Sequence, residues 1–163
     1  MKNVQAIEEK IIPIERIENW VNARKLLSKT IAFTNGCFDI LHEGHIYSLM
    51  QAAKEADFLI VGVNADASVK KLKGEHRPIN TAQNRATILA SLLMVDAVVI
   101  FEEDTPLELI KKIMPDTLVK GGDYIVDTIV GAKEVIANGG KVVINSLIKD
   151  VSTTGIIEKI KSL

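Results

Sequence analysis

Short apolar segments alternate with amphipathic helical segments along most of this chain, and this alternation constrains the fold more than any other feature. Val- and Ile-rich runs typical of buried strands lie at 30–33, 58–63, 97–101, 117–119 and 141–145. Helical periodicity marks 46–56, 65–72, 81–93, 105–114, 132–137 and a last segment from 152. Thr81 is expected to cap the helix at 81–93, and the apolar residues of the last segment, Ile156, Ile157, Ile160 and Leu163, are expected to point inward. Alternating strands and helices form right-handed crossovers, so we predict a doubly wound α/β fold with a mostly five-stranded parallel sheet and helices on both faces.

The domain organisation follows from the same pattern. Residues 1–28 precede the first strand and carry apolar residues at helical spacing, which predicts an amphipathic N-terminal arm that covers the domain or contacts a second subunit. Residues 29–163 form the α/β domain. Ligands of such sheets bind beyond the carboxyl ends of the strands, so the loops that follow the strands are the segments to search.

Composition excludes several classes of protein. The chain has 163 residues, 47% hydrophobic and 25% charged, with a formal net charge of -1. This balance is typical of a globular domain and provides no bulk positive field for nucleic acid or a membrane. Cys37 is the single cysteine, so neither an internal disulfide nor a multi-cysteine metal site is possible. The chain starts without a recognisable leader, and we predict a cytoplasmic protein.

The loop after the first strand is the most informative motif. It reads Thr-Asn-Gly-Cys-Phe-Asp-Ile-Leu-His-Glu-Gly-His over 34–45 and places His42 and His45 around Gly44 at the start of a helix. Helix-start amides favour phosphate, and a glycine lets phosphate approach the backbone closely. The alternatives are two ordinary histidines, or a metal site completed by His76. Metal-ligand spacing is absent here, so phosphate binding is the preferred interpretation.

Weaker signals follow the other strands, and each has a purely structural alternative. Cations cluster at 70–77, where they could close over a polyphosphate or simply be solvated. Arg85 lies on the apolar stripe of its helix, so it needs either an anionic ligand or an internal ion pair with an Asp. The segment 120–124 reads Lys-Gly-Gly-Asp-Tyr and is either a ligand-approach site or a tight turn. Three hydroxyl residues at 152–154 suit either a helix cap or a terminal phosphate.

Taken together, these motifs resemble a known family. The segment 35–45 is similar to the HxGH signature of the nucleotidyltransferase superfamily, which includes cytidylyltransferases and adenylyltransferases. The segments Arg-Pro-Ile-Asn at 77–80, Lys-Gly-Gly-Asp-Tyr at 120–124 and Ser-Thr-Thr at 152–154 resemble the adenylyltransferase domain of bacterial ADP-heptose synthases. The resemblance covers about residues 30–162 in the same order and implies a Rossmann-like nucleotidyltransferase fold.

The resemblance also implies a reaction. ATP and D-glycero-D-manno-heptose 1-phosphate would give ADP-heptose and pyrophosphate by direct in-line displacement, with Mg²⁺ as the partner of the nucleotide and no metal site of the protein's own. The residues assigned to catalysis and phosphate neutralisation are His42, His45, Lys73 and Arg85. Those assigned to the nucleotide are Thr34, Asn35, Gly36, Cys37, Phe38, Gly44, Lys120, Gly122, Asp123, Ser152, Thr153 and Thr154. Asp39, Asp66 and Arg77 are assigned to the acceptor.

Several expectations about partners accompany this reading. In the bifunctional relatives a sugar-kinase domain precedes the adenylyltransferase, so we expect a separate sugar kinase to act upstream of this chain. A homodimer is expected from the apolar arm, whereas nucleic acid and membrane partners are not. Two alternatives remain open: a superfamily member with another acceptor or base, such as a CTP:glycerol-3-phosphate cytidylyltransferase or an FMN adenylyltransferase, or a nucleotide-binding module without catalysis.

Overall fold

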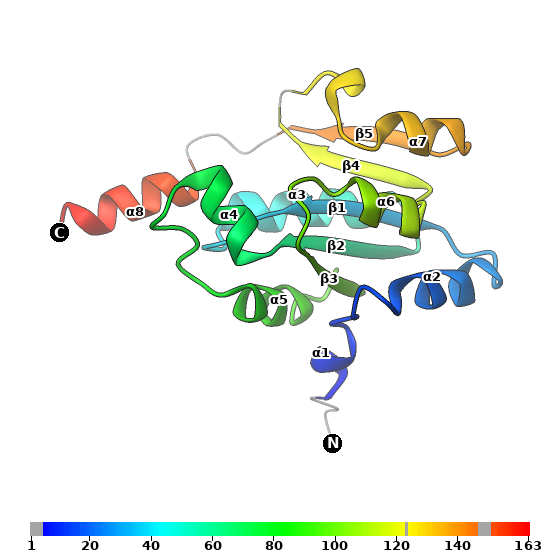
Figure 1. Ribbon diagram of the computed structural model, residues 1–163, viewed down its shortest axis with the longest axis horizontal. Coiled ribbons are helices and arrows are strands. Elements are labelled where there is room, and N and C mark those ends of the chain that lie inside the picture. The colour runs from blue at the N-terminus through cyan, green and yellow to red at the C-terminus, as the bar shows by residue number, and fades with distance from the viewer. Residues whose placement is uncertain (1–4, 123, 147–150) are drawn as a thin grey trace.

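The computed structural model describes residues 5–122, 124–146 and 151–163, and it shows a parallel sheet with helices on both faces (Figure 1). The strands are β1 (Ile31–Gly36), β2 (Phe58–Asn64), β3 (Ala97–Phe101), β4 (Thr117–Gly121) and β5 (Lys141–Asn145). Their order in the sheet is β3-β2-β1-β4-β5, with every pair parallel. The predicted doubly wound α/β fold is therefore confirmed, and the strand order reverses between β1 and β4.

Two hydrophobic clusters hold the helices against the two faces of the sheet. On one face, α2 (Ile17–Lys25), α6 (Leu107–Ile113) and α7 (Ala132–Ala137) pack on alternate strand residues that include Phe33 and Leu118. On the other face, α3 (Glu43–Ala53) and α5 (Ala82–Ala90) pack on the intervening residues, such as Ala32 and Val119. This division follows from the two-residue period of a strand.

The N-terminal segment contributes to this core. It contains α1 (Gln5–Glu9), which lies near α5, and α2, whose Ile17 and Val21 are fully buried. Between these helices, Ile11 forms a parallel bridge with Val98 on the free edge of β3. The backbone N–H of Ile12 donates to Val98 O at 2.9 Å, and Val98 N–H donates to Lys10 O at 2.8 Å. This segment therefore covers the domain and protects an edge strand.

Several element boundaries differ from the prediction. Strand β1 continues to Gly36, and α3 begins at Glu43 rather than at residue 46, because His42 already adopts the N-cap position. The prediction that Ile156, Ile157, Ile160 and Leu163 of the last helix, α8 (Thr153–Lys161), point inward is wrong for the last two. Ile160 is 59% exposed and Leu163 is fully exposed. The start of α8 rests on the domain while its end projects outward (Figure 1).

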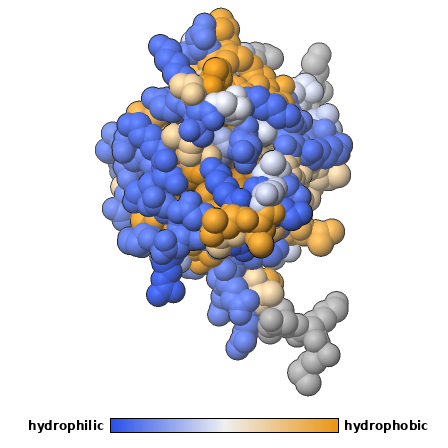
Figure 2. All heavy atoms as spheres, turned by 90° about the vertical axis from the view of Figure 1, so that its right-hand side faces the viewer, coloured by the Kyte–Doolittle hydropathy of each residue, from blue (hydrophilic) through white to orange (hydrophobic). Residues whose placement is uncertain are grey.

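The two edges of the sheet differ in their surroundings. The carboxyl ends of the strands lie beside α4 (Asp66–Lys73) and the start of α8, at the left of Figure 1. The opposite edge, where the strands begin, faces the viewer in Figure 2 as a largely hydrophilic surface with hydrophobic patches. The α2–β1 connection lies at this edge and includes the exposed Leu26 and Leu27. Among the described helices, none is long and apolar enough to cross a membrane.

Candidate functional site

A cavity of about 600 Å³ opens at the carboxyl edge of the sheet, around the point where the strand order reverses. Parallel sheets of this kind bind ligands at such a switch point. The ends of β1, β2 and β4 form its floor, and the starts of α3 and α8 with the end of α4 form its walls. The predicted site residues that line it are Thr34, Asn35, Gly36, Cys37, Phe38, Asp39, His42, Gly44, His45, Lys73, Arg77, Lys120, Ser152, Thr153 and Thr154.

His42 and His45 lie side by side at the start of α3. Their ring centroids are 3.9 Å apart, and His42 occupies the N-cap position in an extended conformation. Both Nδ1 atoms are enclosed, with no hydrogen-bond partner among the residues that the structure describes. A buried N–H without an acceptor is rarer than a buried unpaired acceptor, so the enclosure favours the tautomer that carries its proton on Nε2. Each ring therefore has one N–H to offer a ligand.

Gly44 lets the His42 ring pack closely against the start of α3. A Cβ atom at Gly44 would lie 3.1 Å from both Cε1 and Nδ1 of His42. The imidazole therefore rests directly on the helix backbone, which holds it at the helix N-terminus. There the free amides and the positive end of the helix dipole also attract an anion.

The histidine pair is uncharged at neutral pH in the ligand-free protein. Burial, together with the neighbouring His42, lowers the pKa of His45 to about 4. Burial also lowers the pKa of His42 below its usual value of 6.5. Neutral imidazoles serve as hydrogen-bond donors without a standing charge that would have to be stabilised in the empty cavity.

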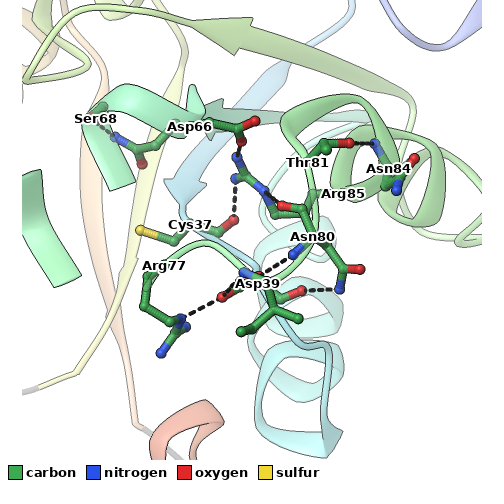
Figure 3. Close-up of polar contacts among 11 residues, drawn as sticks. Cys37, Asp39, Asp66, Ser68, Arg77, Asn80, Thr81, Asn84 and Arg85 are labelled. Atoms are coloured by element: carbon green, nitrogen blue, oxygen red, sulfur yellow. Dashed lines mark hydrogen bonds and ion pairs between the residues drawn. The ribbon is translucent and has the colours of Figure 1, made fainter. Parts of the chain in front are cut away.

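Asp39 connects the first loop to the segment at 77–80 (Figure 3). Its carboxylate, 2% exposed, accepts from Arg77 Nε at 2.6 Å, from Ile79 N–H at 2.8 Å and from Asn80 N–H at 2.9 Å. Burial alone would raise the pKa of Asp39, but these hydrogen bonds outweigh it and hold the pKa below 3.8. Asp39 was predicted to bind acceptor hydroxyls. In the structure its oxygens are occupied by the protein, so its role is to position Arg77 and the loop.

Arg85 binds the backbone of the first loop and of the segment at 77–80 (Figure 3). Its side chain is fully buried and donates to Cys37 O at 2.6 Å, to Asn80 O at 2.9 Å and to Asp66 Oδ1 at 2.7 Å. The structure thus forms the internal ion pair that was the alternative to phosphate binding. Neither Arg85 nor Asp66 lines the cavity, so neither reaches a ligand there as the phosphate and acceptor assignments require.

The remaining cations differ in how they are held. Lys120 Nζ donates to Asn35 Oδ1 at 2.6 Å, and burial lowers the pKa of Lys120 to about 8, which an interaction with Cys37 partly opposes. Lys73 is exposed in the last turn of α4. Arg77 is largely enclosed and already paired with Asp39. The cavity therefore combines one cation on a strand with one at a helix end.

The start of α8 supplies hydroxyl groups to the wall of the cavity. Ser152 Oγ accepts from Gly155 N–H at 3.0 Å and caps the helix, so its own O–H is free to donate. Thr153 Oγ1 donates to Ile40 O at 3.2 Å and joins α8 to the first loop. Thr154 also lines the cavity. Capping thus accounts for Ser152, and attachment to the first loop accounts for Thr153.

Gly122, a predicted nucleotide residue in the loop after β4, is not among the described residues that line the cavity. Gly122 has a positive φ of 127° and its N–H donates to Asn145 O at 3.0 Å. It therefore joins the ends of β4 and β5. The predicted nucleotide residue Asp123 lies outside the described residues.

The cavity also has lining residues that were not among the assigned site residues, although Leu72, Gly121 and Tyr124 belong to segments that the sequence had singled out. These unassigned residues are Ser48, Asn64, Leu72, Gly121, Tyr124 and Val151. Asn64, 4% exposed, ends β2 and donates from Nδ2 to Ser68 Oγ at 3.1 Å. The position of Asn64 at the carboxyl end of a strand could have predicted that it lines the cavity. Ser48 lies one turn after His45 in α3, which the i, i+3 spacing of a helix also indicated.

The donor set of the cavity fits a metal ion that arrives with a nucleotide. Among the described residues, no group of three or more His, Cys, Asp or Glu side chains could hold a metal ion. Asp39 is the carboxylate of the described lining, and protein donors occupy it. Mg²⁺ commonly keeps several waters and is held through substrate phosphates, which such a site can accommodate.

The fold, the switch-point cavity and the histidine pair are those of a nucleotidyltransferase, and the family match agrees. The model of the cytidylyltransferase-like family matches residues 33–159, so this chain belongs to that family.

Individual relatives are similar to nearly the whole of this chain. Bifunctional protein HldE of Caulobacter vibrioides is 52% identical over 155 residues, which are 95% of this chain and 32% of that protein. Bifunctional protein HldE of Haemophilus ducreyi is 52% identical over 153 residues, 94% of this chain and 32% of that protein. The chain thus spans about a third of the length of the curated relatives it matches.

Solved structures show the same fold. The lipopolysaccharide core biosynthesis protein from Thermoplasma volcanium superposes with a TM-score of 0.61 at 25% identity, over 76% of this chain and 99% of that one. Pantoate-beta-alanine ligase from Francisella tularensis has a TM-score of 0.59 at 18% identity, over 94% of this chain and 78% of its own. The second likeness supports the fold alone.

We predict that Asp39→Asn destabilises the protein by about 2–4 kcal/mol, because it removes the charge that pairs with Arg77 and turns an amide group toward backbone donors. Urea denaturation measures this change. Asp104→Asn is the matched control, since Asp104 is 69% exposed in its pair with Lys71. This control should change stability by less than about 0.5 kcal/mol. Equal losses in both variants would contradict the bracing role of Asp39.

We also predict that the stability of the ligand-free protein falls as pH decreases from 6.5 toward 4. In this window the unfolded chain takes up a proton at residue 45 that the native state, with a His45 pKa of about 4, does not bind. Stability therefore rises with pH through this range. Denaturation midpoints measured from pH 4 to 8 should show a weaker dependence in His45→Gln than in the parent protein. Parallel curves would show that His45 is not held neutral in the native state.

Proposed function

We propose that this chain transfers AMP from ATP to D-glycero-D-manno-heptose 1-phosphate, giving ADP-heptose and pyrophosphate. The observation that carries the proposal is that one cavity brings together the histidine pair, the start of α8 and three cationic side chains, which are Lys73, Arg77 and Lys120. Such a cavity suits a polyphosphate and a second phosphate. The choice of substrates is supported by identity of about 50% to HldE proteins over nearly all of this chain.

The chemistry requires positioning more than acid–base catalysis. A phosphate monoester has its second pKa near 6, so it is largely an ionised nucleophile at neutral pH. Its oxygen attacks the α-phosphorus of ATP while the bond to the bridging oxygen breaks and pyrophosphate leaves with the electron pair. The protein must align these atoms and stabilise the charge on the transferring and leaving groups.

His42 and His45 act on the nucleotide phosphates. Their Nε2–H groups and the free amides at the start of α3 are donors fixed before the substrate binds, so little reorganisation accompanies the reaction. Phosphate binding next to these rings favours their protonated forms, which would add positive charge as the transition state forms.

The leaving pyrophosphate needs a second set of donors. Ser152 and Thr154 supply hydroxyl groups at the start of α8, where the helix dipole also favours an anion. Lys73 adds a cation from the end of α4, and Gly74 follows it with a positive φ of 101°. Mg²⁺ bound to the nucleotide would neutralise part of the phosphate charge when present.

Asp39, Arg85 and Asp66 act through the loops in this proposal. They hold the Cys37 carbonyl and the 77–80 segment in place, as their hydrogen bonds indicate. They are therefore positioning residues. Arg77 remains a proposed acceptor ligand, because it lines the cavity and only its Nε is bound to Asp39 among the described contacts.

The reaction also places the chain after a sugar kinase, because its acceptor is a sugar 1-phosphate. The relatives are named bifunctional and are about three times as long as this chain. We propose that a sugar kinase supplies the sugar phosphate, and that the chain works as a homodimer in the cytoplasm. Exposed Leu26, Leu27 and Leu93 provide apolar surface for subunit contacts.

Pyrophosphate release in the presence of Mg²⁺ tests the proposal. ATP, CTP, GTP and UTP are each combined with heptose 1-phosphate, glycerol 3-phosphate and FMN. We expect release with ATP and heptose 1-phosphate alone. Release with CTP and glycerol 3-phosphate, or with ATP and FMN, would replace the substrate assignment and keep the nucleotidyltransferase. Nucleotide binding by folded protein without release for any pair would favour a binding module.

We predict that His45→Ala lowers kcat by a factor of about 10²–10³, because it removes a donor to the transferring phosphate. His76→Ala is the matched control, since His76 is exposed and does not line the cavity. Steady-state kinetics should show nearly unchanged turnover for the control. Near-normal kcat in a folded His45→Ala protein would reject the catalytic role of the pair.

A further inference from the structure

Lys120 is a cation that faces the cavity from the end of β4 without a compensating acid. It lines the cavity, and its Nζ donates to the neutral Asn35 Oδ1 at 2.6 Å. Among the described side chains, no carboxylate forms an ion pair with it. Holding an ammonium away from water without a counter-charge is costly, and burial accordingly lowers the pKa of Lys120 to about 8. The group that binds beside Lys120 should therefore be an anion.

The strand pattern shows on which face of the sheet this anion binds. Phe33 of β1 and Leu118 of β4 are register partners, and both belong to the cluster with α2, α6 and α7. Asn35 and Lys120 each lie two residues further along the same strands, so their side chains point to that same face. Lys120 thus approaches the cavity from the side of α6 and α7.

The histidine pair approaches from the other side. His42 and His45 lie at the start of α3, which packs on the opposite face through Leu49 and Ala52. The start of α8 joins this side, because Thr153 Oγ1 donates to Ile40 O at 3.2 Å. The histidines proposed for the nucleotide phosphates and the hydroxyl groups proposed for the pyrophosphate therefore lie on the α3 side of the sheet.

Displacement at phosphorus requires the attacking and leaving oxygens to lie roughly in line, on opposite sides of the phosphorus atom. With the leaving group on the α3 side, the nucleophile must come from the side of Lys120. We infer that Lys120 binds the phosphate of the acceptor and aims its oxygen at the α-phosphorus, with Asn35 as the residue that positions the ammonium. This inference rests on the proposed function and reassigns Lys120 from the nucleotide to the acceptor.

The local packing suits an aiming role. Lys120 projects from a central strand, whereas Lys73 lies exposed at a helix end. Asn35 is itself confined, since a Cβ atom at Gly62 on the neighbouring strand would lie 3.1 Å from Asn35 Cβ and 2.9 Å from Phe33 Cζ. Lys120 neither gives nor takes a proton in the step. The acceptor oxygen forms the new bond to phosphorus, and the electron pair of the broken bond leaves on pyrophosphate.

The test separates acceptor binding from nucleotide binding. Lys120→Met keeps most of the side-chain length and removes the charge. We expect its kcat/KM for heptose 1-phosphate to fall by a factor of about 10²–10³. Its Kd for α,β-methylene-ATP, measured by calorimetry, should stay within about threefold of the parent value. A comparable loss of affinity for the nucleotide analogue, with an unchanged KM for the acceptor, would overturn the inference.

Two variants control for charge and for geometry. Lys71→Met removes an exposed lysine of α4 that pairs with Asp104 and does not line the cavity. It should leave both kinetic constants unchanged, and a loss as large as that of Lys120→Met would show a general charge effect. Lys120→Arg keeps the charge and should recover part of the acceptor kcat/KM. Failure to recover any activity in a folded protein that binds the nucleotide analogue would count against a charge-based role.

The pH profile gives a second readout that a structural role would not move. Above pH 7.5 both substrates are fully ionised, so an alkaline fall in kcat/KM for the acceptor reports groups of the free enzyme. The other titratable or charged groups that line the cavity are Cys37, Asp39, His42, His45, Lys73, Arg77 and Tyr124.

Asn35→Asp places a negative charge beside the Lys120 ammonium and should move the fall in kcat/KM to higher pH. Lys120→Arg should abolish it up to pH 9.5, and Cys37→Ser should keep it. A fall that Asn35→Asp leaves in place would overturn the role of Lys120.

Failure of the proposed function is distinguishable from failure of this inference. If the parent protein binds α,β-methylene-ATP but turns over no heptose 1-phosphate, the substrate assignment fails. Inorganic phosphate is then titrated into the complex with the analogue. Phosphate binding that Lys120→Met abolishes and Lys71→Met retains would support the acceptor-phosphate site. Equal phosphate binding by the parent protein and Lys120→Met would reject it.

Discussion

The hydrogen bonds of the Asp39 carboxylate hold together two loops that line the cavity. This carboxylate accepts hydrogen bonds from the backbone of Ile79 and Asn80 and from the side chain of Arg77, and it lies in the loop that leads to the histidine pair. Arg85 completes the brace by binding the Cys37 and Asn80 carbonyls. Two loops far apart in sequence are thereby joined, so the start of α3 and the segment at 77–80 keep their spacing.

Around this brace the protein keeps its ligand-binding charges uncompensated. The histidines are neutral before ligand binds, and Lys120 contacts an amide oxygen among the described residues. An ammonium without a counter-charge, such as that of Lys120, is costly to bury and would be stabilised by an anionic ligand. These polar groups reach the cavity from both faces of the sheet. Strands β1 and β4 end side by side at the switch point, and successive side chains along a strand point to opposite faces. This arrangement suits a displacement reaction in which the nucleophile and the leaving group lie on opposite sides of the phosphorus atom.

The sequence predicted some elements well because their signals are local. The alternation of strands and helices indicated the doubly wound sheet, and Thr81 was correctly predicted to cap α5, where its side chain accepts from Asn84 N–H. The end of α8 was mispredicted, since periodicity marks an apolar face without showing whether anything packs against it. Arg85 was correctly predicted to point inward. Its partners were left open, because Asp66 and the Cys37 carbonyl belong to other segments of the chain.

The sequence by itself determined the fold class, the edge of the sheet that binds ligand and the helix-start histidine motif, because each depends on residues close together along the chain. Tertiary structure decided which polar residues line the cavity with free groups and which form hydrogen bonds within the protein. Asp39 and Arg85 are occupied internally, whereas Asn64 and Ser48 line the cavity. The physical reason is that a buried charge must find a partner, and the partner is supplied by whichever distant segment the fold brings near it.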